Sequence, residues 1–149
     1  TQRTLIERSK WLRMANVALR FYSLEPLLEP ISLLYLDGKR ENPATCTVDL
    51  LRGLRFRPGY SDPAWDDQHQ IGWCIIGGES GPRYRPMPLE HVGGLMDIVD
   101  TCRSFDIPVF TKQDAGPYPG KQGRIPDAYW THEMPMVRGF AAKKEESVP

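Results

Sequence analysis

The feature that most constrains the fold is the run WCIIGG at residues 73–78. Six uncharged residues in a polar setting are typical of a parallel β-strand that is buried on both faces. The run continues directly into Glu79, Ser80 and Gly81. Such a strand presents a carboxylate and a hydroxyl at its carboxyl end, where Gly77 and Gly78 allow a ligand or a neighbouring backbone to approach closely.

Further segments favour the same parallel sheet. Residues 17–24 are rich in strand-forming side chains, and Pro26 ends that run. Residues 88–104 predict an amphipathic helix, and residues 109–112 predict a strand that follows it. The apolar side chains of the helix fall on one face: Val92, Leu95, Met96, Val99 and Cys102. The strand–helix–strand order predicts parallel pairing through right-handed crossovers.

The chain length of 149 residues indicates one domain. We expect a single α/β domain over residues 1–140 and a disordered charged tail over residues 141–149. Residues 37–70 contain several prolines and aspartates with little periodicity, and predict a long loop. Lys plus Arg and Asp plus Glu are equal at 19 each, which argues against a generic binder of nucleic acids or membrane surfaces.

The cysteines indicate neither a disulfide framework nor a metal cluster. Cys46, Cys74 and Cys102 lie 28 residues apart, which fits no close-spaced zinc or iron–sulfur motif. Cys74 and Cys102 are expected to be buried thiols of the strand and the helix. No apolar run approaches the ~20 residues of a membrane span, and the polar first residues do not form a signal peptide. These observations favour a reducing, cytoplasmic setting.

Polar side chains collect where the three predicted strands end: Ser23 and Glu25, then Glu79 and Ser80, then Lys112, Gln113 and Asp114. In parallel α/β proteins the functional face lies at the carboxyl ends of the strands. We therefore expect Glu25, Glu79 and Lys112 to lie close together, with the lysine between two acids. A structural role is the alternative, in which the glycines relieve crowding and Glu25 simply pairs with Lys112 or an arginine.

Four segments occur together in a known order: RFYSLEPLLEPI, WCIIGGESGPRYRPM, IPVFTKQD and GRIPDAYWTHEMP. Over about residues 10–135 the chain resembles the C-terminal half of the phage-associated three-cysteine-motif proteins. That family is uncharacterised and is similar to radical S-adenosylmethionine enzymes of the spore-photoproduct-lyase type. The resemblance implies parallel β/α units that form part of a TIM-barrel-like architecture, here an open or partial barrel.

The resemblance also implies that S-adenosylmethionine and a substrate bind at the strand carboxyl ends. The implied cofactor-binding residues are Gly77, Gly78, Glu79, Ser80 and Gly81. The implied substrate-binding residues are Glu25, Arg83, Lys112, Gln113 and Asp114. The family's iron–sulfur cluster would be bound by cysteines of an N-terminal half, and this chain has no matching motif, so we do not expect it to bind the cluster or to cleave the cofactor alone. The resemblance implies a class of reaction and not a particular one.

A non-catalytic phage accessory module that binds a partner protein or a nucleic acid is the alternative. Residues 37–70 offer basic and aromatic side chains for base stacking: Arg52, Arg55, Arg57, Tyr60 and Trp65. Aspartates in the same segment weaken this interpretation. Three strands are too few to close an eight-stranded barrel. The unpaired edge of such a sheet predicts either self-association or an N-terminal half as the partner.

Overall fold

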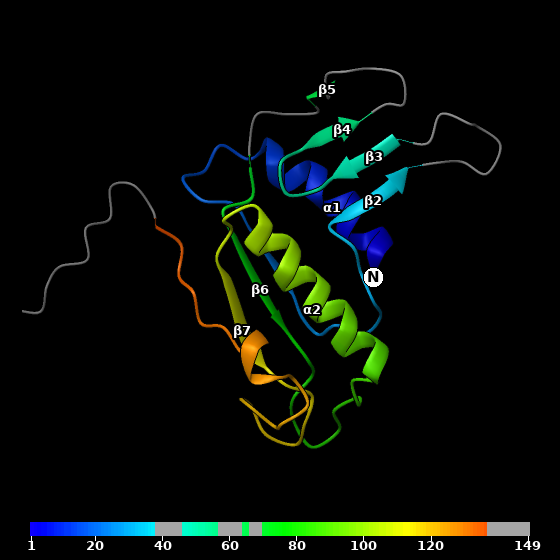
Figure 1. Ribbon diagram of the computed structural model, residues 1–149, viewed down its shortest axis with the longest axis vertical. Coiled ribbons are helices and arrows are strands. Elements are labelled where there is room, and N and C mark those ends of the chain that lie inside the picture. The colour runs from blue at the N-terminus through cyan, green and yellow to red at the C-terminus, as the bar shows by residue number, and fades with distance from the viewer. Residues whose placement is uncertain (38–45, 57–63, 66–69, 137–149) are drawn as a thin grey trace, which may run out of the picture.

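The computed structural model describes residues 1–37, 46–56, 64–65 and 70–136 (Figure 1). In chain order the elements are α1 (Gln2–Met14), β1 (Phe21–Leu24), β2 (Leu34–Asp37), β3 (Cys46–Asp49), β4 (Leu54–Phe56), β5 (Ala64–Trp65), β6 (Trp73–Gly77), α2 (Leu89–Ser104), β7 (Val109–Gln113) and the 3₁₀ turn η1 (Asp127–Tyr129). The strands form two sheets, one with the order β1-β6-β7 and one with the order β2-β3-β4-β5.

The first sheet confirms the predicted parallel pairing. β6 is its central strand and pairs in parallel with β1 on one side and with β7 on the other. α2 follows β6, leads into β7 and lies across both strands (Figure 1). The apolar run at residues 73–78 forms the central strand, as such runs do in parallel sheets. The protein is therefore a mixed α/β protein with an open, three-stranded parallel sheet.

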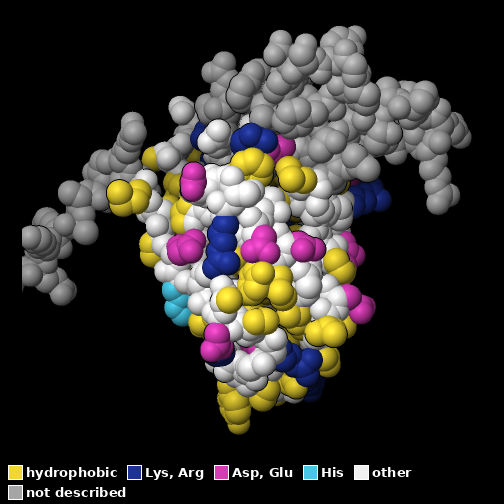
Figure 2. Space-filling model, in the orientation of Figure 1, with side chains coloured by type: hydrophobic (Ala, Val, Ile, Leu, Met, Phe, Trp, Pro, Cys, Tyr) yellow, Lys and Arg dark blue, Asp and Glu magenta, His cyan; other side chains and the backbone are white. Residues whose placement is uncertain are grey.

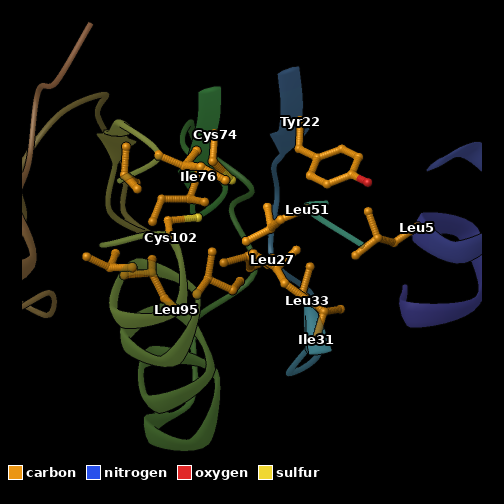
Figure 3. Close-up of a cluster of buried hydrophobic side chains, with 14 of the residues drawn as sticks. Leu5, Tyr22, Leu27, Ile31, Leu33, Leu51, Cys74, Ile76, Leu95 and Cys102 are labelled. Carbon is orange, nitrogen blue, oxygen red and sulfur yellow. The ribbon is translucent and has the colours of Figure 1, made fainter. Parts of the chain in front are cut away.

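The two faces of the parallel sheet differ in burial. Alternate residues of its strands are buried on the face that carries the helices: Tyr22, Cys74, Ile76 and Val109. Figure 3 shows Tyr22 pointing toward α1, and Cys74 and Ile76 lying near Cys102 of α2. The residues between them, such as Phe21 and Ile75, are exposed or only half-buried. The expectation that β6 is buried on both faces is therefore wrong, because both described helices pack on one side.

β1 is shorter than the strand predicted over residues 17–24. It begins at Phe21, and residues 15–20 form the connection from α1. The Arg20 guanidinium donates a hydrogen bond to the Ala15 carbonyl, which bends this connection back on itself. The backbone N–H of Gly72 donates to the Arg20 carbonyl at 2.8 Å, so the connection ends beside the start of β6.

The second sheet corrects the prediction of a long loop over residues 37–70. β3, β4 and β5 lie in that segment and extend β2 into an antiparallel sheet. The turn between β3 and β4 is closed by the Asp49 carboxylate, which accepts hydrogen bonds from the backbone N–H groups of Leu51 and Arg52. Gly53 completes the turn at a φ of 70°, a conformation that glycine adopts without strain. Residues 38–45, 57–63 and 66–69 lie outside the described residues.

One cluster of buried side chains joins both helices and the parallel sheet to the segments just before β2 and just after β3 (Figure 3). The predicted helix over residues 88–104 is confirmed as α2, which buries Val92, Leu95, Val99 and Cys102. Cys74 and Cys102 are both fully buried, as expected. Gly94 of α2 packs against Pro30, where an added Cβ would lie only 3.1 Å from the Pro30 Cα.

Neither helix in the described ranges combines the length and apolar character that crossing a bilayer requires. The predicted tail, residues 141–149, lies outside the described part of the chain.

Candidate functional site at the carboxyl ends of the parallel strands

An ion pair spans the parallel sheet where its strands end. The Lys112 Nζ on β7 lies 3.0 Å from the Glu25 Oε1, just after β1. β6 lies between these two strands, and it ends at Gly77. The Lys112 side chain therefore reaches across the end of the central strand to Glu25. The expected contact between Glu25 and Lys112 is therefore present in the structure.

Glu25 is the most constrained acid at this edge. Its Oε1 also accepts a hydrogen bond from the Ser23 hydroxyl at 3.2 Å. Its Oε2 is buried and has no hydrogen-bond donor among the described residues. Only 17% of the side chain is exposed. A buried carboxylate oxygen without a donor is costly in a folded protein, so this oxygen is a place where a ligand N–H or ammonium group would be favoured.

Glu79 does not share Lys112 with Glu25, contrary to the expected lysine between two acids. Its carboxylate instead pairs with Arg85, whose Nε and Nη2 donate at 2.6 and 3.1 Å and whose backbone N–H donates at 3.0 Å. These hydrogen bonds hold the pKa of the Glu79 carboxyl below its ordinary value. Sequence reasoning missed Arg85, which lies six residues beyond Glu79 in the same loop.

The Glu79 carboxyl is expected to titrate below the ordinary glutamate pKa of about 4.3, and Arg85→Gln should raise it toward that value. Because the folded-state pKa is lowered, the pair stabilises the fold above the ordinary pKa. That contribution is lost as the pH falls through the lowered pKa. Carbon-13 NMR of the side-chain carboxyl measures the titration. Arg83→Gln is the matched control and should leave the pKa of the Glu79 carboxyl unchanged. If Arg85→Gln also left that pKa unchanged, the Glu79–Arg85 ion pair would be wrong.

Gly77 and Gly78 are required by the neighbouring backbone. A Cβ on Gly77 would lie 2.9 Å from the Gln113 carbonyl oxygen, and one on Gly78 would lie 2.5 Å from the Ala115 nitrogen. The Gly78 N–H donates to the Gln113 carbonyl at 2.9 Å. The sequence predicted that either a ligand or a neighbouring backbone approaches these glycines closely. In the structure it is the neighbouring backbone. The space beside these glycines is filled by β7 and the segment after it.

Ser80, Gly81 and Gln113 join the loops that follow β6 and β7. The Ser80 hydroxyl donates to Gln113 Oε1 and the Gln113 side-chain amide donates to the Gly78 carbonyl, both at 2.9 Å. The backbone of Gly116 donates to the Glu79 carbonyl and accepts from the Gly81 N–H. Gly81 has a φ of 123°, so its position requires glycine. Most of the polar groups of these side chains are thus already paired with each other.

Asp114 and Arg83 differ sharply in their surroundings. Asp114 is fully buried. Its carboxylate accepts hydrogen bonds from the backbone N–H groups of Ala115, Arg124 and Ile125. These contacts give Asp114 a structural role in holding the C-terminal segment, and they leave it away from solvent. Arg83 is exposed on the surface of the loop that follows β6.

A cavity of about 360 Å³ adjoins the ion pair on the outer side of β1. It lies between α1 and β1, and the segment that follows Glu25 also lines it. Its volume lies within the range of small-molecule sites in proteins, roughly 300–1,000 Å³. Glu25 lines this cavity and also belongs to the ion pair. The sequence patterns did not predict the cavity, because it depends on the spacing between a helix and a strand.

A row of aromatic rings crosses the half-covered face of the sheet. The Phe21 and Trp73 ring centroids lie 5.6 Å apart, those of Trp73 and Phe110 lie 6.3 Å apart, and His132 stacks on Phe110 at 4.7 Å. The sequence patterns did not single out His132. The row could have been predicted from the positions of three aromatic residues in the predicted strands. Each lies at the first or second residue of a parallel strand: Phe21, Trp73 and Phe110.

The described residues contain no group of three or more His, Cys, Asp and Glu side chains that could hold a metal ion. Cys74 and Cys102 lie together in the core, where the hydrogen bond with the Cys102 thiol, and then burial, raise the pKa of the Cys74 thiol. A raised pKa disfavours the thiolate form that binds metals. These two cysteines therefore act as apolar core residues.

The fold and the charged strand ends define an α/β protein with a candidate ligand-binding edge on a three-stranded parallel sheet. The chain belongs to the family described as "Protein of unknown function (DUF5131)", whose family model matches residues 1–141. Neither the curated proteins nor the solved structures gave a match.

Proposed function

We propose that this chain is the C-terminal part of a radical S-adenosylmethionine-like enzyme of a TIM-barrel-like architecture. In this proposal the carboxyl ends of β1, β6 and β7 form part of the face that binds cofactor and substrate. The observation that supports it best is the Lys112–Glu25 pair, which spans the central strand beside a buried Glu25 oxygen that lacks a donor. Ligands of parallel α/β proteins bind at this edge of the sheet.

The chemistry of this edge fits the amino-acid part of S-adenosylmethionine. Glu25 would accept hydrogen bonds from an ammonium group, and Lys112 would pair with a carboxylate. The Ser23 hydroxyl, which is exposed beside Glu25, could bond to either group. Gly77 and Gly78 do not fit the expected role of admitting the cofactor backbone, because β7 occupies that space. Glu79 and Ser80 fit less well than Glu25, because Arg85 and Gln113 already bind them.

The proposal requires a second part that carries the cluster. S-adenosylmethionine supplies radical chemistry when a reduced iron–sulfur cluster cleaves it. An N-terminal half, in the same polypeptide or a separate one, would hold that cluster. The residues described here would bind and orient the cofactor and the substrate, with Glu25 and Lys112 at the centre.

Titration of the full chain with S-adenosylmethionine is expected to show binding, and Glu25→Gln is expected to weaken it about 10- to 100-fold. This range corresponds to one hydrogen bond to a charged group. Isothermal calorimetry measures the affinity. The fold should be little affected, because the Lys112 side chain is half-exposed and an ion pair at the surface contributes only about 0–1 kcal/mol.

Glu90→Gln is the control for this titration, because Glu90 lies exposed on α2. It should bind the cofactor as the unmodified chain does. Absence of binding to the unmodified chain, or equal binding by Glu25→Gln, would contradict the assignment of this site.

A non-catalytic phage accessory module that binds a nucleic acid or a partner protein is the second candidate. The aromatic row supports it, because exposed rings offer stacking surfaces for bases and 43% of Phe21 is exposed. Of the side chains first considered for stacking, Arg52 is paired with Asp49 and lies over the Phe105 ring. The side chains of Arg55, Arg57, Tyr60 and Trp65 lie outside the described part of the chain.

Charge gives this second candidate little support. On the described part of the face seen in Figure 2, acidic and basic side chains lie interspersed among apolar ones. A nucleic-acid site normally requires a surface on which Lys and Arg predominate. A single-stranded oligonucleotide that binds the full chain, combined with no binding of S-adenosylmethionine, would favour this candidate over the enzyme.

A further inference from the structure

The pair α1–β1 repeats the arrangement of α2–β7. Each helix leads through a short connection, residues 15–20 or residues 105–108, into a strand of the parallel sheet. Figure 3 shows Tyr22 of β1 pointing toward α1, and Cys74 and Ile76 of β6 lying near Cys102 of α2. α2 covers its own strand, β7, and also the parallel neighbour β6 (Figure 1). α1 has its own strand, β1, but among the described residues it has no second parallel strand to cover.

The cavity lies where that second strand would be. One wall is a single stripe of α1, formed by residues three or four positions apart: Thr1, Leu5, Arg8 and Leu12. The other wall consists of five consecutive residues, Phe21 to Glu25, and thus runs along the whole of β1. The cavity therefore borders the whole length of β1.

The two outer edges of the parallel sheet differ in whether another segment covers them. The outer edge of β7 is covered, since the Thr111 N–H donates to the Thr131 carbonyl at 2.7 Å and the Glu133 N–H donates to the Val109 carbonyl at 3.0 Å. The outer edge of β1 pairs with no strand in the part of the chain that the structure describes. Unpaired strand edges bind extended peptides through backbone hydrogen bonds.

The side chains around the cavity complement an apolar strand with one basic group. Phe21 and Leu28 line the cavity and remain 43% and 42% exposed, although both are large apolar residues. Glu25 lines it at the carboxyl end of β1 and has an oxygen without a donor. A neighbouring strand would cover the apolar side chains, and a Lys or Arg at its carboxyl end would reach Glu25.

We propose that the groove between α1 and the outer edge of β1 is a docking site for one extended segment of a partner polypeptide. The segment adds to the sheet as a fourth strand, parallel to β1, with apolar side chains at alternate positions and a basic side chain beside Glu25. The parallel direction follows from the match between α1–β1 and α2–β7. The proposal concerns the edge of the sheet. It uses the same donor-free Glu25 oxygen as the cofactor chemistry proposed above, so the basic side chain and the cofactor would exclude each other at that oxygen.

The test uses an acetylated heptapeptide that alternates threonine and valine and ends in lysine. It is added at about 1 mM, which detects dissociation constants in the millimolar range, to the full chain labelled with nitrogen-15. We expect amide shifts at Phe21 to Glu25 and along the α1 stripe. The same peptide with alternate N-methylated amides should produce none. A peptide with the lysine at its amino end should bind more weakly, since it reaches Glu25 only in the antiparallel direction.

Two variants of α1 complete the test. Arg8→Trp fills the groove and is expected to abolish the shifts at β1, whereas Lys10→Trp, outside the groove on the same helix, should leave them unchanged. Absence of shifts at β1 with the unmodified chain, or equal binding of the N-methylated peptide, would overturn the proposal. A second copy of this chain is the other possible occupant of the groove, and sedimentation velocity without peptide tests for it. A dimer that dissociates in the Arg8→Trp variant would show that a second copy fills the groove. That result would also overturn the proposal.

Discussion

Asp114→Ala is expected to lower the free energy of unfolding by about 3–5 kcal/mol. The buried Asp114 carboxylate accepts hydrogen bonds from the N–H groups of Ala115 and Arg124, both at 2.7 Å, and from that of Ile125 at 3.3 Å. Alanine removes the acceptor for all three donors, and each buried donor left unpaired costs about 1–3 kcal/mol. Urea unfolding followed by circular dichroism measures the loss.

Asp127→Ala is the matched control for this substitution. Asp127 is exposed, and its partner is the Lys121 side chain at the surface. Removing an exposed ion pair should change the free energy of unfolding by less than about 1 kcal/mol. If Asp114→Ala unfolded at the same urea concentration as Asp127→Ala, the structural role of Asp114 would be wrong.

Gly78→Ala is expected to destabilise the fold by about 2–4 kcal/mol. The added Cβ would lie 2.5 Å from the Ala115 nitrogen and 2.9 Å from the Asp114 carbonyl carbon. These neighbours are backbone atoms, so they can move away only if the hydrogen bonds between the two loops break. One such bond joins the Gly78 N–H to the Gln113 carbonyl. The thermal midpoint and the urea midpoint should both fall.

Gly93→Ala is the control, and it is expected to raise the free energy of unfolding instead of lowering it. Gly93 lies inside α2, and an added Cβ there has no described atom within 4 Å. Alanine in a helix is more stable than glycine by about 0.5–1 kcal/mol. A Gly78→Ala protein as stable as Gly93→Ala would show that the loops after β6 and β7 separate easily. That result would reopen the space beside Gly78 to a ligand.

The parallel sheet could be predicted because its patterns are local and strong. The apolar run at residues 73–78 and the one-sided helix that follows can both be recognised from neighbouring residues alone. The start of β1 could not be predicted, because residues 17–20 have strand-forming side chains but are held in a bend by Arg20. Tertiary contacts override strand propensity at such positions.

The antiparallel sheet could not be predicted from periodicity. Its strands span only two to four residues each, which is too short for an alternating pattern to be recognised. The turn between β3 and β4 depends on the Asp49 side chain, whose bonds to the backbone of Leu51 and Arg52 have no strong sequence signature.

The location of the candidate site could be predicted from the sequence, but the ion-pair partner of each charged residue could not. The carboxyl-end rule correctly brought Glu25 and Lys112 together, because both follow or end parallel strands of one sheet. The partner of Glu79 depends on the loop conformation instead, in which Gly81 at a φ of 123° precedes Arg85. Asp114 could be recognised as structural only when residues 124 and 125 were seen to fold back onto it.

The cover that Thr131 and Glu133 place over β7 also limits how copies of this protein can aggregate. A sheet with two reactive edges can add copies at both ends and grow into an open-ended fibre. A sheet with one reactive edge can pair with the same edge of a second copy, and the resulting pair has no reactive edge left at which to grow. In the parallel sheet, the segment after η1 thus leaves β1 as the unpaired outer strand among the described residues, and deleting that segment would expose the outer edge of β7 as well.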